Sequence, residues 1–226
     1  MEPLDLPAEV PVMTLPNTVF FPQSLLPLHI FEPRYRAMLR DVLKTNRLFA
    51  VARLDRSRSA EPGAVEPPHN IATLGIVRAC QDADDGTSNL LLQGVCRVEI
   101  RDIVRELPYR LIAVSPLVSH RGGDHAQLEI LRLEVLRLLN LRRRLGSPAP
   151  KGMTQFLESI EDFDTFADVA VFNLCEDSPL KQQLLEELDT HRRLTRFAAQ
   201  LRVDIEQHRL RRKLQGGLAE DGIANN

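Results

Sequence analysis

The chain has 226 residues, of which 43% are hydrophobic and 27% are charged. This balance is typical of a globular protein and excludes a disordered chain. The chain has 13 basic and 14 acidic residues before Ser115, and 16 and 17 after it. Because neither half is basic, the charge argues against a nucleic-acid partner. No apolar run approaches the roughly 18 residues of a membrane-spanning helix, so no membrane partner is expected.

The cysteines and the N-terminal residues indicate in which cellular compartment the protein is expected. Cys80, Cys96 and Cys175 are odd in number and far apart in the sequence, which fits a reducing cytosol better than a disulfide framework. Acidic residues stand at the N-terminus, where a secretory signal would have basic residues and then an apolar run. The sequence therefore predicts a cytoplasmic protein.

The pattern of the first half is typical of strands. Between Leu90 and Arg101 the even positions are mostly apolar, and the odd positions include Arg97 and Glu99, so we expect one buried face and one solvated face. A turn cluster at residues 82–89 joins this run to the preceding one as a hairpin. Six strands at this spacing indicate a small barrel or two packed sheets. They are predicted at Val10–Leu15, Leu25–Phe31, Leu48–Leu54, Ile71–Cys80, Leu90–Arg101 and Tyr109–Val114.

Helical spacing dominates the second half. Only one helix, beginning near Pro33, is predicted among the strands. Asp124 is expected to cap a helix, two short helices follow, and Ser178 begins a helix of some 35 residues, about 50 Å long. The long apolar stripe of this last helix must be buried by other helices or by a second chain. An oligomer could therefore form through this helix. We therefore expect an α+β protein with a β-barrel domain at 1–118 and a helical bundle domain at 119–226.

The sequence contains no recognisable motif for catalysis, for a cofactor or for a metal. It has no Gly-Lys pair of a phosphate-binding loop, no HxxxH or CxxC spacing and no GxSxG elbow. The run from Asp82 to Gly86 resembles a calcium loop, but Gly86 stands one position early and Gln93 replaces the closing glutamate, so a turn is the better interpretation. We expect no catalytic residue, no cofactor and no metal, and a protein that is not an enzyme.

Four prolines interrupt the strand-like segment from Leu15 to Arg36. Prolines confine such strands to the edges, starts or bulges of a sheet. Phe20, Phe21 and Pro22 admit two interpretations, as residues packed inward against the barrel or as a protruding apolar tip that grips an unfolded chain. Inward packing is favoured, because large apolar residues beside proline usually face a core. The three residues are nevertheless our candidates for polypeptide binding.

Four ordered motifs carry a family resemblance. The first is Leu-Pro-Asn-Thr-Val-Phe-Phe-Pro at 15–22 with Leu-Pro-Leu-His-Ile-Phe-Glu-Pro-Arg-Tyr at 26–35. The others are Leu-Gly-Ile-Val at 74–77, Asp-Gly at 85–86 with Leu-Gln-Gly-Val-Cys-Arg-Val at 92–98, and the helical pair at 181–186 and 189–194. Together they resemble the N-terminal substrate-binding domain of the ATP-dependent protease Lon. The resemblance spans roughly residues 10–205, which is nearly the whole chain.

This resemblance implies a PUA-like β-pseudobarrel followed by a helical bundle. It also implies a stand-alone Lon-domain protein without the ATPase and Ser-Lys peptidase modules, which agrees with the missing phosphate-binding loop. Glu32 and Arg34, which flank a proline, are expected to form an ion pair. The motif residues are expected to determine the fold rather than chemistry: Pro16, Asn17, Pro22, Pro27, Phe31, Glu32, Arg34, Tyr35, Gly75, Gly86, Gly94 and Arg97.

The expected function is that of a non-catalytic module that binds an unfolded polypeptide or a protein partner, as an adaptor or regulator. Its mechanism would be addition of a strand to a sheet edge or burial of apolar side chains. Two other classes stay open. One is a small-ligand-binding protein or unrecognised enzyme with a pocket at the barrel/bundle junction. The other is an RNA-binding protein, since PUA-like barrels elsewhere have that role, although the even charge balance argues against it.

Overall fold

The computed structural model describes residues 6–60, 65–146 and 152–216. The chain forms two compact units, one of Met1–His120 with Ala167–Leu188 and one of Arg121–Phe166 with Asp189–Asn226. Residues 167–188, which the sequence assigned to the helical domain, therefore pack with the strands. Among the described helices, none is both long enough and apolar enough to cross a membrane.

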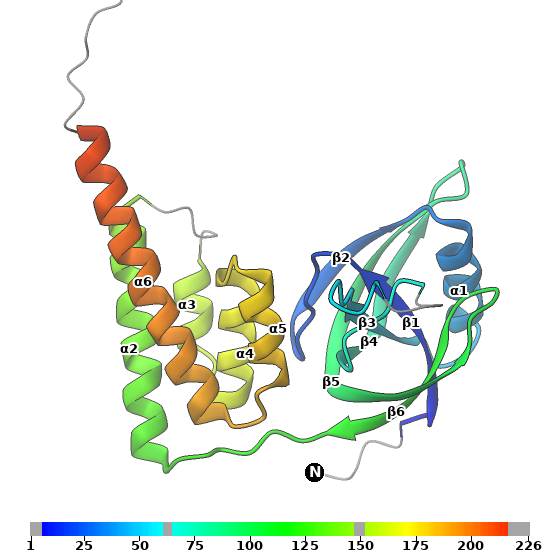
Figure 1. The fold of residues 1–226 in the computed structure, drawn as a ribbon, viewed down its shortest axis with the longest axis horizontal. Helices are drawn as coiled ribbons and strands as arrows, with labels where there is room; N and C mark the ends of the chain where they lie inside the picture. Colours follow the sequence, from blue (N-terminus) through cyan, green and yellow to red (C-terminus); the bar gives the residue numbers. More distant parts are fainter. Residues whose placement is uncertain (1–5, 61–64, 147–151, 217–226) are drawn as a thin grey trace, which may run out of the picture. The chain divides into compact units, whose positions relative to one another are not determined.

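A six-stranded sheet that closes partly on itself forms the centre of the first unit (Figure 1). The strand order is β2-β5-β4-β3-β1-β6, and β5 also pairs with β6. Strand β5 is long enough to pair with β2 along Ser88–Gln93 and with β6 along Arg97–Arg105. The ring therefore contains five strands, and β2 lies outside it. The described strands are β1 (Glu9–Leu15), β2 (Leu25–Ile30), β3 (Leu48–Arg53), β4 (Ile71–Asp82), β5 (Ser88–Arg105) and β6 (Leu111–Leu117).

The sheet and the helix inserted after β2 are held by a shared apolar core. Helix α1 (Pro33–Leu43) begins with Pro33 in its first turn, where the missing N–H has no helical partner to lose. It buries Met38, Leu39 and Val42 against the inward faces of the strands. The α+β class, the barrel and the inserted helix predicted from the sequence are thus confirmed.

Five further helices are described. Of these, α4 (Phe163–Leu174) begins at the boundary between the units, and α5 (Ser178–Glu186) lies in the first unit. The second unit contains α2 (His125–Arg144), α3 (Met153–Glu158) and α6 (Thr190–Gly216), with α2 packed along α6. Asp124 caps α2 as predicted, because its carboxylate accepts a 2.8 Å hydrogen bond from the Gln127 N–H.

The single helix predicted from Ser178 onward is wrong. The chain leaves helical geometry at Glu187 and begins α6 at Thr190. Two contacts fix this break: the Leu188 carbonyl accepts a 2.9 Å hydrogen bond from the His120 N–H, and the Asp189 carboxylate caps α6 by accepting one from the Arg192 N–H at 3.0 Å. A long C-terminal helix is present, but it is α6 alone.

Candidate functional site

Phe20, Phe21 and Pro22 do not form a protruding tip. Phe20 and Phe21 are 1% and 0% exposed, and Pro22 is also buried. The ring of Phe20 meets that of Phe172 on α4 edge-on at 6.2 Å, and the Phe21 ring lies 5.8 Å from the Arg97 guanidinium. The burial of all three residues agrees with the favoured interpretation of inward packing and does not support the alternative of a protruding tip that grips an unfolded chain.

Close backbone packing holds this segment against the sheet. A Cβ atom at Gly94 would lie 2.1 Å from the Phe21 carbonyl oxygen, so only glycine permits the approach. The Gln23 N–H donates to the Gly94 carbonyl and the Gly94 N–H donates to the Ser24 carbonyl, both at 2.9 Å. The Thr73 hydroxyl donates to the Phe20 carbonyl at 2.6 Å. The segment thus serves to anchor the start of β2.

Strand β2 presents an apolar stripe to the surface. Its side chains alternate, so that Leu25, Pro27 and His29 are exposed while the intervening ones face inward. Leu25 is 50% exposed and Phe31, just after the strand, is 60% exposed. The rings of His29 and Phe31 stack with centroids 6.0 Å apart. We call Leu25, Pro27, His29 and Phe31 the β2 stripe.

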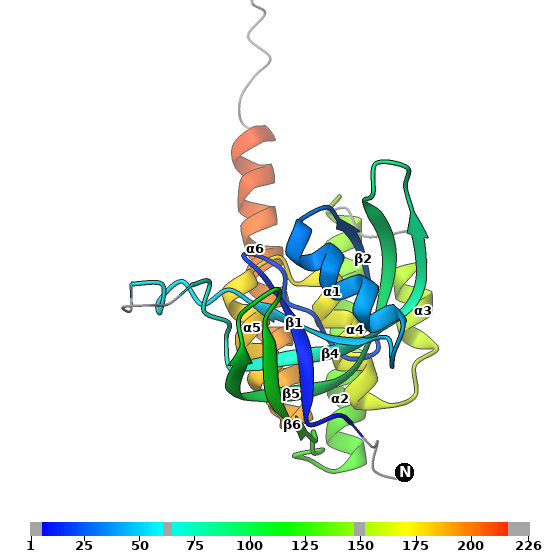
Figure 2. The ribbon, with the colours of Figure 1, turned by 90° about the vertical axis from the view of Figure 1, so that its right-hand side faces the viewer.

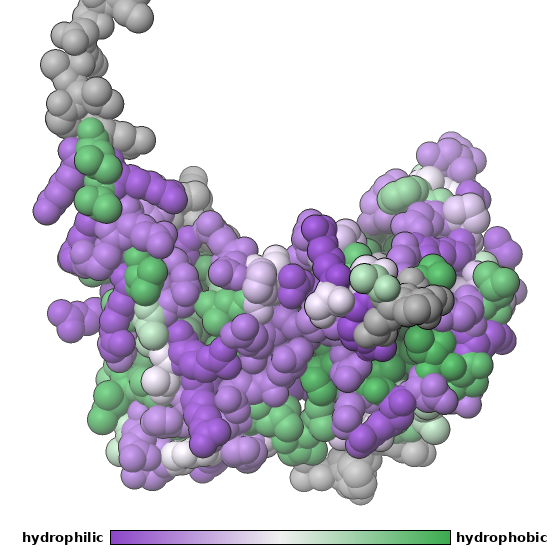
Figure 3. All heavy atoms as spheres, viewed as in Figure 1, coloured by the Kyte–Doolittle hydropathy of each residue, from purple (hydrophilic) through white to green (hydrophobic). Residues whose placement is uncertain are grey.

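The stripe is one of several exposed apolar features of the surface. On the face drawn in Figure 3, apolar patches alternate with hydrophilic areas. Isolated apolar side chains on a surface are ordinary, whereas contiguous apolar patches of about several hundred Å² are typical of interaction sites. The next strand extends the stripe, because Leu91 of β5 pairs with Pro27 and is half-buried. The His29 Nδ1 and the Asn89 Oδ1 lie 2.9 Å apart beside it.

The backbone of β2 also has an open edge. In the described residues its only strand partner is β5. In an antiparallel pair, the backbone groups of successive residues point alternately toward and away from the partner strand. Because the Gly94 N–H donates to the Ser24 carbonyl, the N–H and C=O groups of the even-numbered residues of β2 point toward β5. The carbonyls of Leu25, Pro27 and His29 then point to the other side, together with the N–H groups of Leu25 and His29. Pro27 has no N–H, so no hydrogen-bond donor is missing from the β5 side of the strand. This agrees with the edge position that the prolines predicted.

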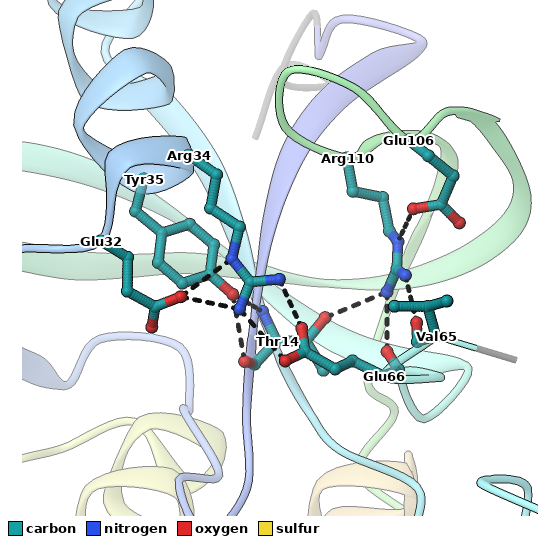
Figure 4. Close-up of polar contacts among 8 residues, drawn as sticks. All are labelled: Thr14, Glu32, Arg34, Tyr35, Val65, Glu66, Glu106 and Arg110. Carbon is teal, nitrogen blue, oxygen red and sulfur yellow. Dashed lines mark hydrogen bonds and ion pairs between the residues drawn. The ribbon is translucent and has the colours of Figure 1, made fainter.

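A network of ion pairs fixes the chain just after the stripe (Figure 4). The Arg34 Nε donates to the Glu32 carboxylate at 2.9 Å, which confirms the expected pair, and its Nη1 donates to the Glu66 carboxylate at 2.6 Å. The Glu66 hydrogen bond raises the pKa of Arg34 above its usual value. Tyr35 exchanges 3.3 Å hydrogen bonds with the Thr14 backbone, and burial raises its pKa. Phe31 therefore directly precedes a segment that is hydrogen-bonded to the loop at Glu66 and to β1.

Arg110 holds the other side of the same network. Figure 4 shows its guanidinium directed at the loop of Val65 and Glu66. It donates to the Glu66 carbonyl at 2.7 Å, to the Val65 carbonyl at 2.5 Å and to the Glu106 carboxylate at 2.9 Å. These bonds tie the loop that precedes β4 to the turn between β5 and β6.

Arg97 differs from its predicted position on the solvated face of β5. It is 2% exposed and forms a two-pronged ion pair with Asp168 of α4. The other motif residues lie in several settings. Tyr35 is buried, Gly75 and Gly94 allow close packing, and Phe31 is exposed instead of supporting the core.

The sequence analysis did not find the stripe as a binding surface. Leu25 belongs to no motif that we singled out, His29 was noted only as part of the motif at 26–35, and Pro27 and Phe31 were assigned to the fold. The available signal was the alternation of these residues within a proline-containing strand. Elsewhere, among the described residues, no group of three or more His, Cys, Asp or Glu side chains could hold a metal ion.

These features define a barrel module with a strand edge that carries exposed apolar side chains. The family described as the ATP-dependent protease La (LON) substrate-binding domain matches residues 9–202. The chain belongs to this family. It spans about a quarter of the length of the curated relatives that it matches.

Two of these relatives are Lon proteases. That of Desulfosudis oleivorans is 26% identical over 219 residues, which are 96% of this chain and 26% of the relative. That of Anaeromyxobacter dehalogenans is 27% identical over 191 residues, which are 84% of this chain and 22% of the relative. Both similarities cover most of this chain.

Solved structures confirm the fold. The N-terminal domain of the Mycobacterium avium complex Lon protease has a TM-score of 0.66 at 18% identity, covering 87% of this chain and 98% of that one. A Lon N-terminal domain protein from Xanthomonas campestris has a TM-score of 0.55 at 22% identity, covering 84% and 97%.

Proposed function

We propose that this protein is a non-catalytic module that binds exposed apolar segments of polypeptides, acting in the cytoplasm as an adaptor or regulator. The observation that carries the proposal is the β2 stripe beside an open strand edge. The family description as a substrate-binding domain supports the same role. Neither feature requires a cofactor.

The two parts of the site would act together. A bound segment would add as a strand beside β2, pairing with the backbone groups of Leu25 and His29. The apolar side chains of the bound segment would then contact the β2 stripe on one face of the sheet. Phe31 would lie at the end of this contact, and Leu91 would lie beside it on β5. The missing N–H of Pro27 would weaken pairing with another β2 edge, which limits aggregation through this strand.

The binding test uses fluorescence anisotropy with a labelled, reduced and unfolded protein as the probe. Leu25→Asp/Phe31→Asp should weaken binding by at least about tenfold, because two charges replace apolar contacts at exposed positions. Ile130→Asp/Leu133→Asp on α2 is the matched control, since both of its side chains are also exposed. Affinity should change little between low and high salt.

A second probe separates strand addition from simple apolar contact. An apolar peptide carrying N-methyl groups at alternate residues on its pairing edge should bind more weakly than the same peptide methylated on the opposite edge. Equal losses in the stripe variant and the α2 control would overturn the proposal. Tight binding of single-stranded RNA that collapses at high salt would favour the RNA-binding alternative instead.

We also propose that α6 can pair with a second copy of the chain. Val203, Leu210 and Leu214 are exposed and recur at helical spacing along one face. Leu210→Asp/Leu214→Asp should then shift the sedimentation coefficient from that of a dimer to that of a monomer. A monomeric wild-type protein at high concentration would contradict the pairing.

A further inference from the structure

A second surface of the first unit has the opposite character to the β2 stripe. Figures 1 and 2 both show α1 beside the tip of the β4–β5 hairpin. Between them lies a pocket of about 450 Å³. One wall is lined by three basic residues, Arg36 and Arg40 of α1 and Lys44 at the C-cap of the helix, and the other by Asp82 and hairpin residues 86–88.

The three cations are spaced regularly. They stand at positions i, i+4 and i+8, so they follow one face of the helix with a rise of about 6 Å between neighbours. Leu39 and Leu43 form an apolar part of the same wall. The row is therefore cationic and follows one side of the helix, with the partly exposed Leu43 beside it.

The lining of this pocket carries more positive than negative charge. The side chains of Arg36, Arg40 and Lys44 make no hydrogen bond or ion pair within the described part of the chain. The lining includes one carboxylate, that of Asp82, which accepts a 2.7 Å hydrogen bond from the Ser88 hydroxyl and keeps its negative charge, so the three cations outnumber it. An anionic ligand would supply what the pocket lacks.

Gly86 makes the pocket a built feature of the hairpin. Its φ of +78° suits glycine, and a Cβ atom there would lie 2.2 Å from the Arg36 Nη2. Arg36 is half-buried, and its guanidinium lies against the turn at Gly86. A larger residue at position 86 would push Arg36 out of the row.

We propose that this pocket binds an extended acidic segment of a polypeptide. Acidic side chains at alternate positions of an extended chain lie about 6.6–6.8 Å apart on one face, close to the 6 Å rise of the cations. Three alternating carboxylates would meet Arg36, Arg40 and Lys44 in order. Single-stranded RNA fits less well, since none of the lining residues is aromatic and could stack a base.

The inference rests on the proposed function in taking the ligand to be a polypeptide, but it uses different residues. It assigns the protein a second preference, for segments that carry alternating acidic residues. The pocket and the β2 stripe can therefore be tested separately, each with its own variant and its own probe.

The probe is a labelled peptide of serine and alanine with three glutamates at alternate positions, and its composition-matched control has the glutamates three residues apart. Wild-type protein should bind the alternating peptide at least about tenfold more tightly than the control, with affinity that falls as salt rises. Arg40→Glu/Lys44→Glu should weaken binding of the alternating peptide by a similar factor. Arg137→Glu/Arg211→Glu, which changes the net charge equally at exposed sites on α2 and α6, should leave it unchanged.

The outcomes separate the two proposals. If the unfolded apolar protein binds but neither acidic peptide does, the pocket inference fails and the proposed function stands. Equal binding of both peptides, or equal loss in both double variants, would overturn the inference by showing a non-specific charge effect. Competition by inorganic phosphate or by single-stranded RNA at lower concentration than the peptide would also overturn it, as a phosphate site. A circular dichroism spectrum like that of wild type confirms that Arg40→Glu/Lys44→Glu remains folded.

Discussion

Arg97 of β5 and Asp168 of α4 are joined by two parallel hydrogen bonds, of 2.7 Å from Nη1 to Oδ2 and 2.6 Å from Nη2 to Oδ1. Both side chains are almost fully buried, at 2% and 1% exposed. The Arg97 Nε also donates to the Leu185 carbonyl at 2.9 Å. One side chain therefore connects the barrel to α4 and to the end of α5, which explains why residues 167–188 belong to the first unit.

Removing one partner of this pair should be costly. Arg97→Met should lower the free energy of unfolding by about 3–5 kcal/mol, because Asp168 would be left as a buried charge without its partner. Urea unfolding followed by circular dichroism measures the loss. Arg101→Met is the control on the same strand, and should cost about 1 kcal/mol or less because its pair with Glu99 is exposed.

The double variant Arg97→Met/Asp168→Leu distinguishes ion pairing from general disruption. It should recover most of the lost stability, since an apolar pair of similar size avoids the cost of burying charge. If Arg97→Met were no more destabilising than Arg101→Met, the pair would not be what holds α4 to the barrel.

The packing of residues 20–22 against β5 leads to a prediction for glycine. Gly94→Ala should lower the free energy of unfolding by about 1–3 kcal/mol, because its methyl group would meet the carbonyl oxygen of Phe21. Gly75→Ala should cost less, since the atoms that its methyl group would meet belong to the buried side chains of Leu92 and Phe20, which can shift more than a backbone carbonyl oxygen held in place by the sheet. Urea unfolding of both variants tests this order, and a Gly75→Ala loss larger than that of Gly94→Ala would contradict it.

Local signals in the sequence predicted most of the elements. The proline at the start of α1, the cap at Asp124 and the alternation within β5 each act over a few residues, so a single sequence carries them. The edge position of β2 also followed from its proline, because a missing N–H can be tolerated only where no strand pairs.

Contacts between distant residues account for what the sequence did not reveal. Arg97 alternates with apolar residues as a solvated side chain would, and its partner lies 71 positions away. Leu184, Leu188 and His191 keep helical spacing across the break between α5 and α6, whereas the His120 hydrogen bond that fixes the break comes from another segment. Phe20 and Phe21 could face either way, and the absence of a side chain at Gly94 decides the matter.

The two tyrosines give a pH-dependent test of the barrel. The chain contains no tryptophan, so Tyr35 and Tyr109 dominate the near-ultraviolet absorbance. Burial raises the pKa of both phenols, and for Tyr109 the 2.8 Å hydrogen bond to the Asp41 carboxylate raises it further. Their phenolate absorbance should therefore appear at higher pH in the folded protein than in urea, where a pKa of about 10 is expected.

The raised pKa values of Tyr35 and Tyr109 also determine how the free energy of unfolding depends on pH. Below about pH 10 both states keep the phenol protons, so the contribution is constant. Above it the unfolded chain releases protons that the folded chain retains, and the free energy of unfolding should fall as pH rises through the folded pKa values. Tyr35→Phe and Tyr109→Phe should each make this fall shallower in urea unfolding measured across the range. Coincident titration curves for the folded and urea-unfolded protein would show that neither phenol is buried as described.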